Sequence, residues 1–280
     1  MEVFPVLLQE LTDESLDTTA SGVASKKVLS SLSGGKQNNP KVEGIKRGVI
    51  TGASVNSNAE KLTETAEQIR ARWGVDVFAE PVDVTDFKAV TAFFGKVREK
   101  FGNIDICVAN AGGPPAGTFE SFSLDDWREA FEGSFMSTLH MIREVLPGMR
   151  SQRWGRIVTI TSISVKQSID GLILSNAIRA SVVGLLKSLV REYGSDNVLF
   201  NNVCPGATAT DRLLNVAANR AAQQGTTREE VLENMGAQIP LGRVGQPEEF
   251  GPLVAFLCSE RAAYITGTST AIDGGEVRGA

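Results

Sequence analysis

The amino-acid sequence predicts an α/β fold: one doubly wound domain in which a parallel sheet has helices on both faces. From about residue 47 onward, short β-rich runs alternate with amphipathic helical segments, which is the pattern of strands joined by crossover helices. The chain has 280 residues, of which 42% are apolar, and this is enough to bury one sizeable core. About six strands are expected, near residues 47–51, 75–79, 104–109, 156–161, 198–203 and 266–272.

Helical segments between these strands are marked by apolar residues at helical spacing. One set ends before Gly74 and consists of Leu62, Ala66, Ile69 and Trp73. A second set ends before Gly102, a residue suited to a helix C-terminus, and consists of Phe87, Val90, Phe94, Val97 and Phe101. Further helices are predicted near 124–150, 174–194 and 247–259, with one or two short ones within 211–237.

Residues 1–44 differ in composition from the rest of the chain. A short apolar piece over 6–11 is followed by a stretch rich in Ser, Thr, Gly and Lys. Such a segment offers few groups whose burial can offset the entropy of ordering. We therefore expect residues 1–44 to be a disordered extension and residues 45–280 to form the domain.

Composition argues against several kinds of partner. A net charge of −5 without a block of Lys or Arg gives no footprint for nucleic acid or an anionic membrane. No run approaches the roughly 18 apolar residues of a membrane span, and the first residues lack the pattern of a signal or transit peptide. A cytoplasmic location is therefore expected.

Metal and disulfide chemistry are not expected either. The cysteines, Cys107, Cys204 and Cys258, are far apart and lie in apolar elements, which is typical of reduced core residues. The only histidine, His140, lies in a predicted helix with no ligand at metal spacing, so we interpret it as a partly buried helix residue.

Four short motifs follow one another at the ends of the predicted strands. They are Asp83-Val84-Thr85, Asn110-Ala111-Gly112-Gly113, Pro205-Gly206-Ala207-Thr208-Ala209-Thr210 and Asp273-Gly274-Gly275. Each alone is an ordinary turn, but together they resemble the short-chain dehydrogenases/reductases, and among them the bacterial 3-oxoacyl-carrier-protein reductases. The resemblance covers about residues 45–280 and implies a single Rossmann-like domain that binds NADP or NAD.

The resemblance also implies roles for the residues of these motifs. Asp83 matches the acidic turn that binds the adenine ring, and Asn110 matches the asparagine that steadies the central strand beside the cofactor. The segment that meets the nicotinamide amide and the phosphates is matched by Pro205, Gly206, Thr208 and Thr210.

The first phosphate-binding turn departs from the family pattern. Family members follow the first strand with Thr-Gly-x-x-x-Gly-x-Gly. In this chain no glycine lies between Gly52 and Gly74, so Gly52 is the one residue of this turn that we expect to bind the cofactor. A helix and a strand, about 20 residues, are therefore predicted to be missing, and Ser57 with Glu60 can form a capping box in their place. Two explanations stay open: a real deletion that weakens cofactor affinity, or a gene model that lost or misjoined an exon.

A serine, a second hydroxyl and a cation have the spacing of the family's catalytic site. Ser162 follows a predicted strand, Ser175 lies thirteen residues later, and Arg179 follows one helical turn on. The resemblance places them at the family's serine, tyrosine and lysine, and it places Ser134 at the asparagine that anchors a water in the proton relay. Ser162 is expected to orient the carbonyl and Arg179 to bind the ribose. Ser175 is a weak substitute, because an aliphatic hydroxyl is far less acidic than a phenol with a pKa near 10, and arginine stays protonated.

The resemblance implies an NAD(P)-dependent oxidoreductase that reduces a ketone or oxidises a secondary alcohol. The segment 209–242 lies at the place of the family's substrate lid, and its apolar residues either pack two short helices together or line a lid. A lid would suit a small to medium hydrophobic substrate, from acyl-chain or secondary metabolism. The expected partners are this small molecule and further copies of the chain, in a homo-dimer or tetramer. The alternative is a catalytically silent family member that serves as a structural or regulatory subunit, in a hetero-oligomer with an active relative.

Overall fold

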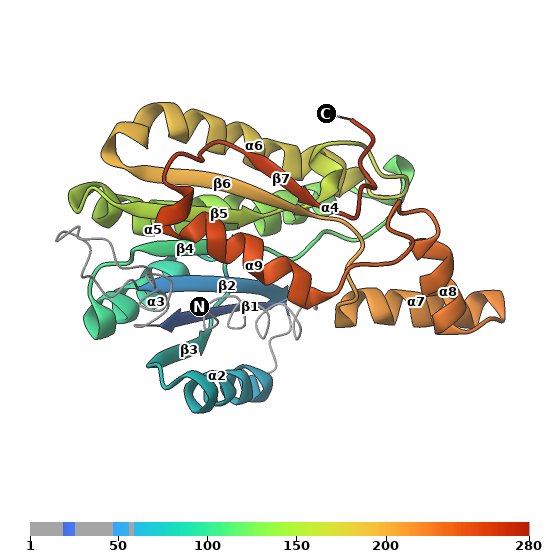
Figure 1. Cartoon of the computed structure of the whole chain (residues 1–280), viewed down its shortest axis with the longest axis horizontal. Coiled ribbons are helices and arrows are strands. Elements are labelled where there is room, and N and C mark those ends of the chain that lie inside the picture. Colours follow the sequence, from blue (N-terminus) through green and yellow to red (C-terminus); the bar gives the residue numbers. More distant parts are fainter. Residues whose placement is uncertain (1–18, 26–46, 56–58, 280) are drawn as a thin grey trace.

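The computed structural model describes residues 19–25, 47–55 and 59–279, which form a sheet with helices on both faces (Figure 1). Seven strands are hydrogen-bonded in the order β3-β1-β2-β4-β5-β6-β7. They are β1 (Thr19–Ser25), β2 (Gly48–Val55), β3 (Val77–Pro81), β4 (Ile106–Asn110), β5 (Gly155–Ile160), β6 (Val198–Pro205) and β7 (Ser269–Ile272). The six strands predicted from the sequence are confirmed as β2 to β7.

Five neighbouring strands, β2, β4, β5, β6 and β7, run parallel. Every residue of β4 is buried, as is every residue of β6 except the last. Continuous burial of this kind is typical of a parallel sheet covered by helices on both faces. The predicted doubly wound α/β fold is therefore confirmed.

The helices lie between the strands in the predicted order. They are α2 (Ala59–Trp73), α3 (Phe87–Phe101), α4 (Leu124–Phe131), α5 (Ser137–Ser151), α6 (Ile173–Tyr193), α7 (Asp211–Gln224), α8 (Arg228–Gly236) and α9 (Pro247–Cys258). The segment predicted as one helix over 124–150 is interrupted, because a π-helical turn, Glu132–Met136, separates α4 from α5. The short helices predicted within 211–237 are α7 and α8.

The residues at the two ends of α3 determine where this helix begins and ends. The Asp86 side chain accepts hydrogen bonds from the backbone N–H groups of Lys88 and Ala89, which satisfies donors that have no partner inside the helix. Gly102 follows the last residue with a φ of 80°, a conformation that glycine adopts without strain. Between these ends, Val90, Phe94, Val97 and Phe101 of the predicted apolar stripe are buried, whereas Phe87 at the first position of the helix is exposed.

Two apolar layers cover the sheet, because successive strand side chains point to opposite faces. On β4, Ile106 and Val108 pack with α2 and α9, whereas Cys107 and Ala109 pack with α3, α5 and α6. Figure 1 shows α9 crossing one face of the sheet and α5 behind the other. The core is therefore one sheet between two helical layers.

The N-terminal segment supplies a strand that the sequence did not predict. β1 lies between β2 and β3 and is antiparallel to both, with Val23 opposite Ile50 on one side and Ala79 on the other. The chain passes directly from β2 through α2 to β3, so the predicted absence of one βα unit holds for the described part of this region. β1 takes the place in the sheet that this absence leaves. The expected disorder of residues 1–44 therefore does not apply to Thr19–Ser25, and the other residues of the extension lie outside the described residues.

One helix is apolar enough to be compared with a membrane span. Among the described residues, the helical segment Ile173–Asp196, which contains α6, includes an 18-residue window with a mean hydropathy of 1.4 and is long and apolar enough to cross a membrane. The expectation that no segment approaches a span is corrected to this extent. The buried side chains Val182 and Leu186 belong to the apolar layer on the sheet, and the helix carries the buried Arg179. Its packing identifies α6 as a core helix of the domain.

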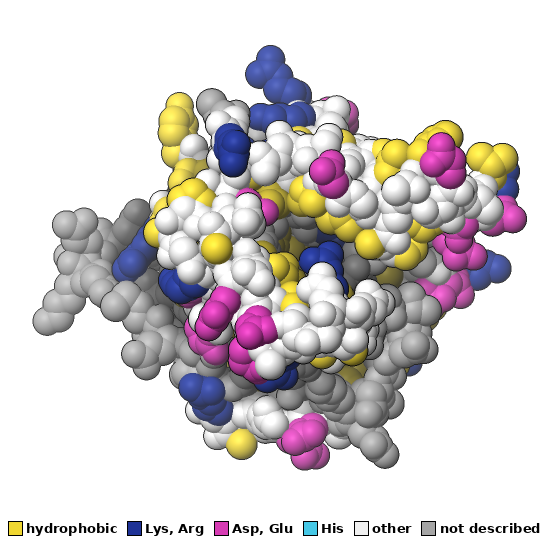
Figure 2. All heavy atoms as spheres, turned by 90° about the vertical axis from the view of Figure 1, so that its right-hand side faces the viewer, with side chains coloured by type: hydrophobic (Ala, Val, Ile, Leu, Met, Phe, Trp, Pro, Cys, Tyr) yellow, Lys and Arg dark blue, Asp and Glu magenta, His cyan; other side chains and the backbone are white. Residues whose placement is uncertain are grey.

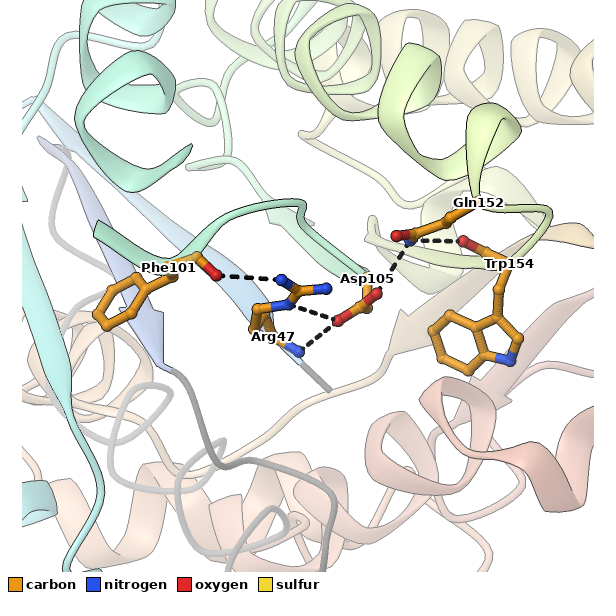
Figure 3. Close-up of polar contacts among 5 residues, drawn as sticks. All are labelled: Arg47, Phe101, Asp105, Gln152 and Trp154. Carbon is orange, nitrogen blue, oxygen red and sulfur yellow. Dashed lines mark hydrogen bonds and ion pairs between the residues drawn. The ribbon is translucent and has the colours of Figure 1, made fainter. Parts of the chain in front are cut away.

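A buried carboxylate ties three strands together at the edge of the sheet opposite the functional site (Figure 3). Asp105, just before β4, accepts hydrogen bonds from the backbone N–H and the Nε of Arg47, at 2.7 and 3.1 Å. Gln152, just before β5, donates to the other oxygen of Asp105 at 2.9 Å and also to the Trp154 carbonyl. Arg47 completes the network with a bond to the Phe101 carbonyl. The network fixes the starts of β2, β4 and β5 relative to one another.

We expect Asp105→Ala to lower the free energy of unfolding by about 2 to 4 kcal/mol, because it leaves half-buried donors of Arg47 and Gln152 without their acceptor. Urea unfolding followed by circular dichroism measures this change. Asp125→Ala is the control, since Asp125 pairs with Arg128 on the surface and both side chains are more than two-thirds exposed; its effect should stay within about 1 kcal/mol. Equal effects of the two substitutions would contradict the role given to Asp105.

Candidate active site

The predicted catalytic residues lie at the carboxyl edge of the parallel strands. Ser162 follows β5, Ser175 and Arg179 lie in the first turns of α6, and Ser134 lies in the π-helical turn before α5. Figure 2 faces this edge and shows a hollow whose rim carries apolar side chains, with Lys or Arg atoms visible inside it. In open α/β sheets, ligands bind at this edge.

Arg179 fastens α6 to the ends of two strands. Its side chain is buried, and one guanidinium nitrogen donates to the Ala111 carbonyl at 3.2 Å. The other terminal nitrogen donates to the carbonyl of Thr161, the residue before Ser162. Because these carbonyls follow β4 and β5, the guanidinium holds the start of α6 against both strands. The expected position of Arg179 next to Ser162 is therefore found.

The serines form a chain of hydrogen bonds beside Arg179. The Oγ of Ser162 accepts a hydrogen bond from the backbone N–H of Ser164 at 3.1 Å. The hydroxyl of Ser164 lies 3.0 Å from the hydroxyl of Ser175, and both residues are buried. Ser164 thus links Ser162 to Ser175, and Arg179 binds the carbonyl of the residue before Ser162. Ser164 was missed, and its signal was present: it is the second serine of the turn that follows β5.

Ser134 does not join this chain in the described hydrogen bonds. Ser134 is buried, and its backbone carbonyl accepts a hydrogen bond from the Thr138 hydroxyl at 3.0 Å. The neighbouring carbonyl of Gly133 accepts one from Ser137 at 2.6 Å. These hydroxyls bond carbonyls within the π-helical turn. The predicted role of Ser134 in a proton relay stays a prediction.

Two of the predicted cofactor residues lie in well-fixed positions at the same edge. Asn110 is the last residue of β4 and is buried. Asp83 follows β3, and its carboxylate accepts hydrogen bonds from the N–H and hydroxyl of Thr85 at 2.8 and 2.6 Å. The ring of the buried His140 reaches the Val84 carbonyl through Nδ1 at 3.1 Å, and since a carbonyl only accepts, Nδ1 carries the hydrogen. His140 is thus a buried helix residue that supports the Asp83 turn.

The Pro205–Thr210 turn leaves β6 between the site and the end of β7. The N–H of Gly206 donates to the Ile272 carbonyl at 2.9 Å, and the Thr208 hydroxyl donates to the Gly206 carbonyl at 3.3 Å. Thr210 is the N-cap residue of α7 and is buried. The predicted residues of this turn therefore lie at the carboxyl edge, next to the turn that contains Ser162.

The phosphate-binding turn is the part of the predicted site that the described residues do not form. Gly52 lies inside β2, where it pairs with Ser21 of β1. A residue in a strand does not give the tight turn that brings a backbone close to a pyrophosphate. The predicted capping box of Ser57 and Glu60 lies outside the described residues.

No metal or disulfide site is found among the residues that the structure describes. It contains no group of three or more potential ligands, and the cysteines are free and buried. Burial raises the pKa of Cys107 to about 12 and raises the pKa of Cys204 and Cys258 as well. Buried thiols of this kind are protonated and inert.

The C-terminal turn packs on Gly206 so closely that no side chain fits there. A Cβ at this position would lie 2.8 Å from the Cα of Asp273 and 3.1 Å from Oε2 of Glu276. Burial raises the pKa of Glu276 above its ordinary value of 4.5, a hydrogen bond from the Ala207 N–H lowers it in part, and the charge of Asp273 raises it. Glu276 therefore holds its proton more tightly in the folded protein than in the unfolded chain.

We expect this carboxyl to make stability depend on pH. Because the folded pKa is raised, the free energy of unfolding falls as the pH rises from about 4.5 through the folded pKa. Glu276→Gln has no proton to lose, so its free energy of unfolding should fall less over this range. Urea unfolding at several pH values compares the two proteins, and identical slopes would show that Glu276 does not titrate in this way.

The fold and the position of the site define a Rossmann-type α/β protein. Comparison with known proteins gives the family. The model of the enoyl-(acyl carrier protein) reductase family matches residues 50–276. The 3-oxoacyl-[acyl-carrier-protein] reductase FabG of Aquifex aeolicus is 34% identical over 227 residues, which cover 81% of this chain and 86% of the relative. The chain therefore belongs to the short-chain dehydrogenase/reductase family.

Solved structures agree with this assignment. L-sorbose reductase from Gluconobacter frateurii, in complex with NADPH and L-sorbose, has a TM-score of 0.76 and 30% identity, over 79% of this chain and 84% of that one. A short-chain oxidoreductase from Pseudomonas aeruginosa PAO1, solved with NADPH and described as containing an atypical catalytic center, has a TM-score of 0.71 and 30% identity, over 80% and 85%. These relatives are oxidoreductases.

Proposed function

We propose that the chain is an NADPH- or NADH-dependent ketoreductase that uses an atypical Ser162, Ser175 and Arg179 site. The observation that carries this proposal is the convergence of these side chains at the carboxyl edge of the sheet. The NADPH-bound relatives support the choice of cofactor. One of them combines NADPH binding with an atypical catalytic center, so a departure from the family's residues is compatible with a cofactor-binding protein.

The residues present fit the nicotinamide half of the cofactor better than the phosphate half. Thr208 and Thr210 would meet the nicotinamide amide, Arg179 the ribose, and Asp83 the adenine ring. Arg179 lies at the carboxyl ends of β4 and β5, and the turn with Thr208 and Thr210 follows β6, so these residues share one edge of the sheet. Gly52, held in a strand, lacks the turn that binds the pyrophosphate. We therefore propose that the cofactor binds, with an affinity below that of relatives that retain the glycine turn.

The mechanism that we propose relies on hydrogen bonding to the carbonyl oxygen. When bound, a reduced nicotinamide supplies the hydride. The Ser162 hydroxyl already accepts the Ser164 N–H, so its own hydrogen is available for the carbonyl oxygen of the substrate. Ser175 is a weak acid and Arg179 does not release its proton, so water delivers the proton. The loss of a positioned acid typically slows such a step by about 10²- to 10⁴-fold.

The proposed substrate is a small to medium hydrophobic ketone, such as an acyl thioester or a polyketide intermediate. Apolar residues of α7 and α8 pack together, and Val216 and Leu241 are exposed beside them. An apolar cover over the carboxyl edge suits a hydrophobic substrate. The name of the FabG relative supports a 3-oxoacyl compound. Acyl-chain or secondary metabolism in the cytoplasm is the proposed setting.

The proposed assembly is a homo-dimer or tetramer. Leu124 and Phe131 of α4 are exposed apolar residues, with exposed fractions of 74% and 39%, and a second copy of the chain would cover them. A second candidate function is a catalytically silent subunit that pairs with an active relative. The serine at the tyrosine position and the strand conformation of Gly52 favour it. Size-exclusion chromatography of the purified chain, alone and mixed with a relative from the same cell, separates these assemblies.

The purified chain should bind NADPH and reduce acetoacetyl-CoA, a 3-oxoacyl thioester, slowly. Calorimetry measures the binding of NADPH and NADH, and the loss of absorbance at 340 nm measures turnover. We expect dissociation constants weaker than the micromolar range and a kcat about 10²- to 10⁴-fold below a typical value of about 10 per second. An absence of binding at millimolar cofactor would refute the proposed enzyme and favour the silent subunit.

Restoring the family's acid should raise the rate. The double variant Ser175→Tyr with Arg179→Lys supplies a phenol and an ammonium in place of an aliphatic hydroxyl and a guanidinium. We expect kcat to rise by at least about 10-fold, whereas Arg179→Lys alone should give no gain because no acid has been added. Circular dichroism and the melting temperature show whether the larger ring is accommodated. A folded double variant that is no faster than wild type would contradict the assignment of Ser175 to the acid position.

A further inference from the structure

One residue outside the family's catalytic positions contacts both active-site serines. The backbone N–H of Ser164 donates to the Ser162 Oγ at 3.1 Å, and the Ser164 hydroxyl lies 3.0 Å from that of Ser175. We propose that Ser164 is a positioning residue that holds the two hydroxyls as a pair of hydrogen-bond donors for one carbonyl oxygen. The proposal rests on the proposed ketoreductase function and adds a residue to it.

The turn that carries Ser164 is fixed by its own backbone. It is a short 3₁₀ helix, Ile163–Val165, in which Val165 N–H donates to the Ser162 carbonyl at 3.2 Å and Lys166 N–H to the Ile163 carbonyl at 2.8 Å. Arg179 holds the facing helix through the carbonyl of Thr161. The Ser164 and Ser175 hydroxyls are therefore held together from both sides, on a fixed turn and on a docked helix.

The direction of the protons follows from what each hydroxyl can do. A hydroxyl donates one hydrogen bond and accepts two. Ser162 accepts from a backbone N–H, which donates only, so its own hydrogen is free to point toward a ligand. We assign Ser164 as the donor in its bond to Ser175, which leaves the Ser175 hydrogen free in the same way. Both hydroxyl hydrogens are then available to one carbonyl oxygen.

Burial makes this pair useful for catalysis. Ser164 and Ser175 are 5% and 7% exposed, and hydrogen bonds are electrostatically stronger where water is scarce. Donors fixed in advance around a developing oxyanion lower the barrier, and the loss of one such donor typically costs about 10²- to 10³-fold in kcat. Hydride arrives at the carbonyl carbon, the oxygen takes on negative charge between the two hydroxyls, and a proton from water then completes the alcohol. Ser164 contributes by aiming Ser175, without contacting substrate.

Ser164→Ala tests this proposal against Ser164→Thr, which keeps a hydroxyl, and against Ser181→Ala. Ser181 lies on α6, as Ser175 does, and its hydroxyl donates to the Ile178 carbonyl at 2.6 Å. Ser181→Ala therefore removes a hydroxyl from α6 that bonds its own helix instead of an active-site serine. We expect Ser164→Ala to lower kcat for acetoacetyl-CoA by at least about 10-fold, with KM and the dissociation constant of NADPH within about twofold. Ser164→Thr should retain most of the rate, and Ser181→Ala all of it.

A double-mutant comparison asks whether Ser164 acts through Ser175. In a Ser175→Ala background, Ser164→Ala should cause no further loss of kcat, because the hydroxyl that it aims is gone. Equal and independent losses in the two backgrounds would overturn the proposal, as would a Ser164→Thr variant as slow as Ser164→Ala or a Ser164→Ala variant as fast as Ser181→Ala.

A readout without turnover separates this inference from the proposed function. The infrared stretch of the ketone carbonyl of acetoacetyl-CoA, bound to the cofactor-free protein, should lie below its value in solution for wild type and return toward that value in Ser164→Ala. A shifted band in a protein that does not oxidise NADPH would refute the ketoreductase and leave the pair of donors standing. An unshifted band in wild type would refute the pair, whatever the protein's activity.

Discussion

The geometry of the candidate site depends on the Arg179 guanidinium between the carbonyls of Thr161 and Ala111. These carbonyls belong to segments that follow different strands, and a planar fork with several donors can reach both at once. A lysine would offer a compact point charge on a flexible stem. The guanidinium of Arg179 therefore forms a rigid tie between helix and sheet. The serines of the site are brought together by that tie.

A second constraint acts on the other half of the sheet. In the described residues a single helix, α2, lies between β2 and β3, and these two strands are not hydrogen-bonded to each other. β1 joins them, and its antiparallel pairing extends along β2 as far as Val55. Pairing satisfies backbone groups that an open edge leaves exposed. The same pairing holds Gly52 in an extended strand, so the interaction that completes the sheet also removes the turn on which pyrophosphate binding depends in the family.

Local sequence patterns were sufficient to predict most of the architecture. They could not predict the contacts between segments that lie far apart in the sequence. Strands β2 to β7 and the apolar stripe of α3 follow from composition and periodicity. β1 has the sequence TASGVAS, which lacks the alternation that marks a half-buried strand, and its pairing is decided by what β2 and β3 leave open. The contact of Ser164 with Ser175 joins residues eleven positions apart on a turn and a helix. No spacing rule predicts it, because it depends on how α6 docks.

The hydrogen-bonded serines and arginine at the site help to decide between an enzyme and a silent subunit. Buried hydroxyls and a buried guanidinium stabilise a fold little compared with apolar side chains of similar volume, because their desolvation offsets most of what their hydrogen bonds contribute. A subunit with a purely structural role gains more from an apolar contact between α6 and the turn after β5. The hydroxyls of Ser164 and Ser175 are instead paired with each other, and the Ser162 hydroxyl accepts a backbone N–H, which leaves its own hydrogen available. Such an arrangement does little for stability and suits the binding of a polar atom, so we favour a site that still meets a carbonyl oxygen.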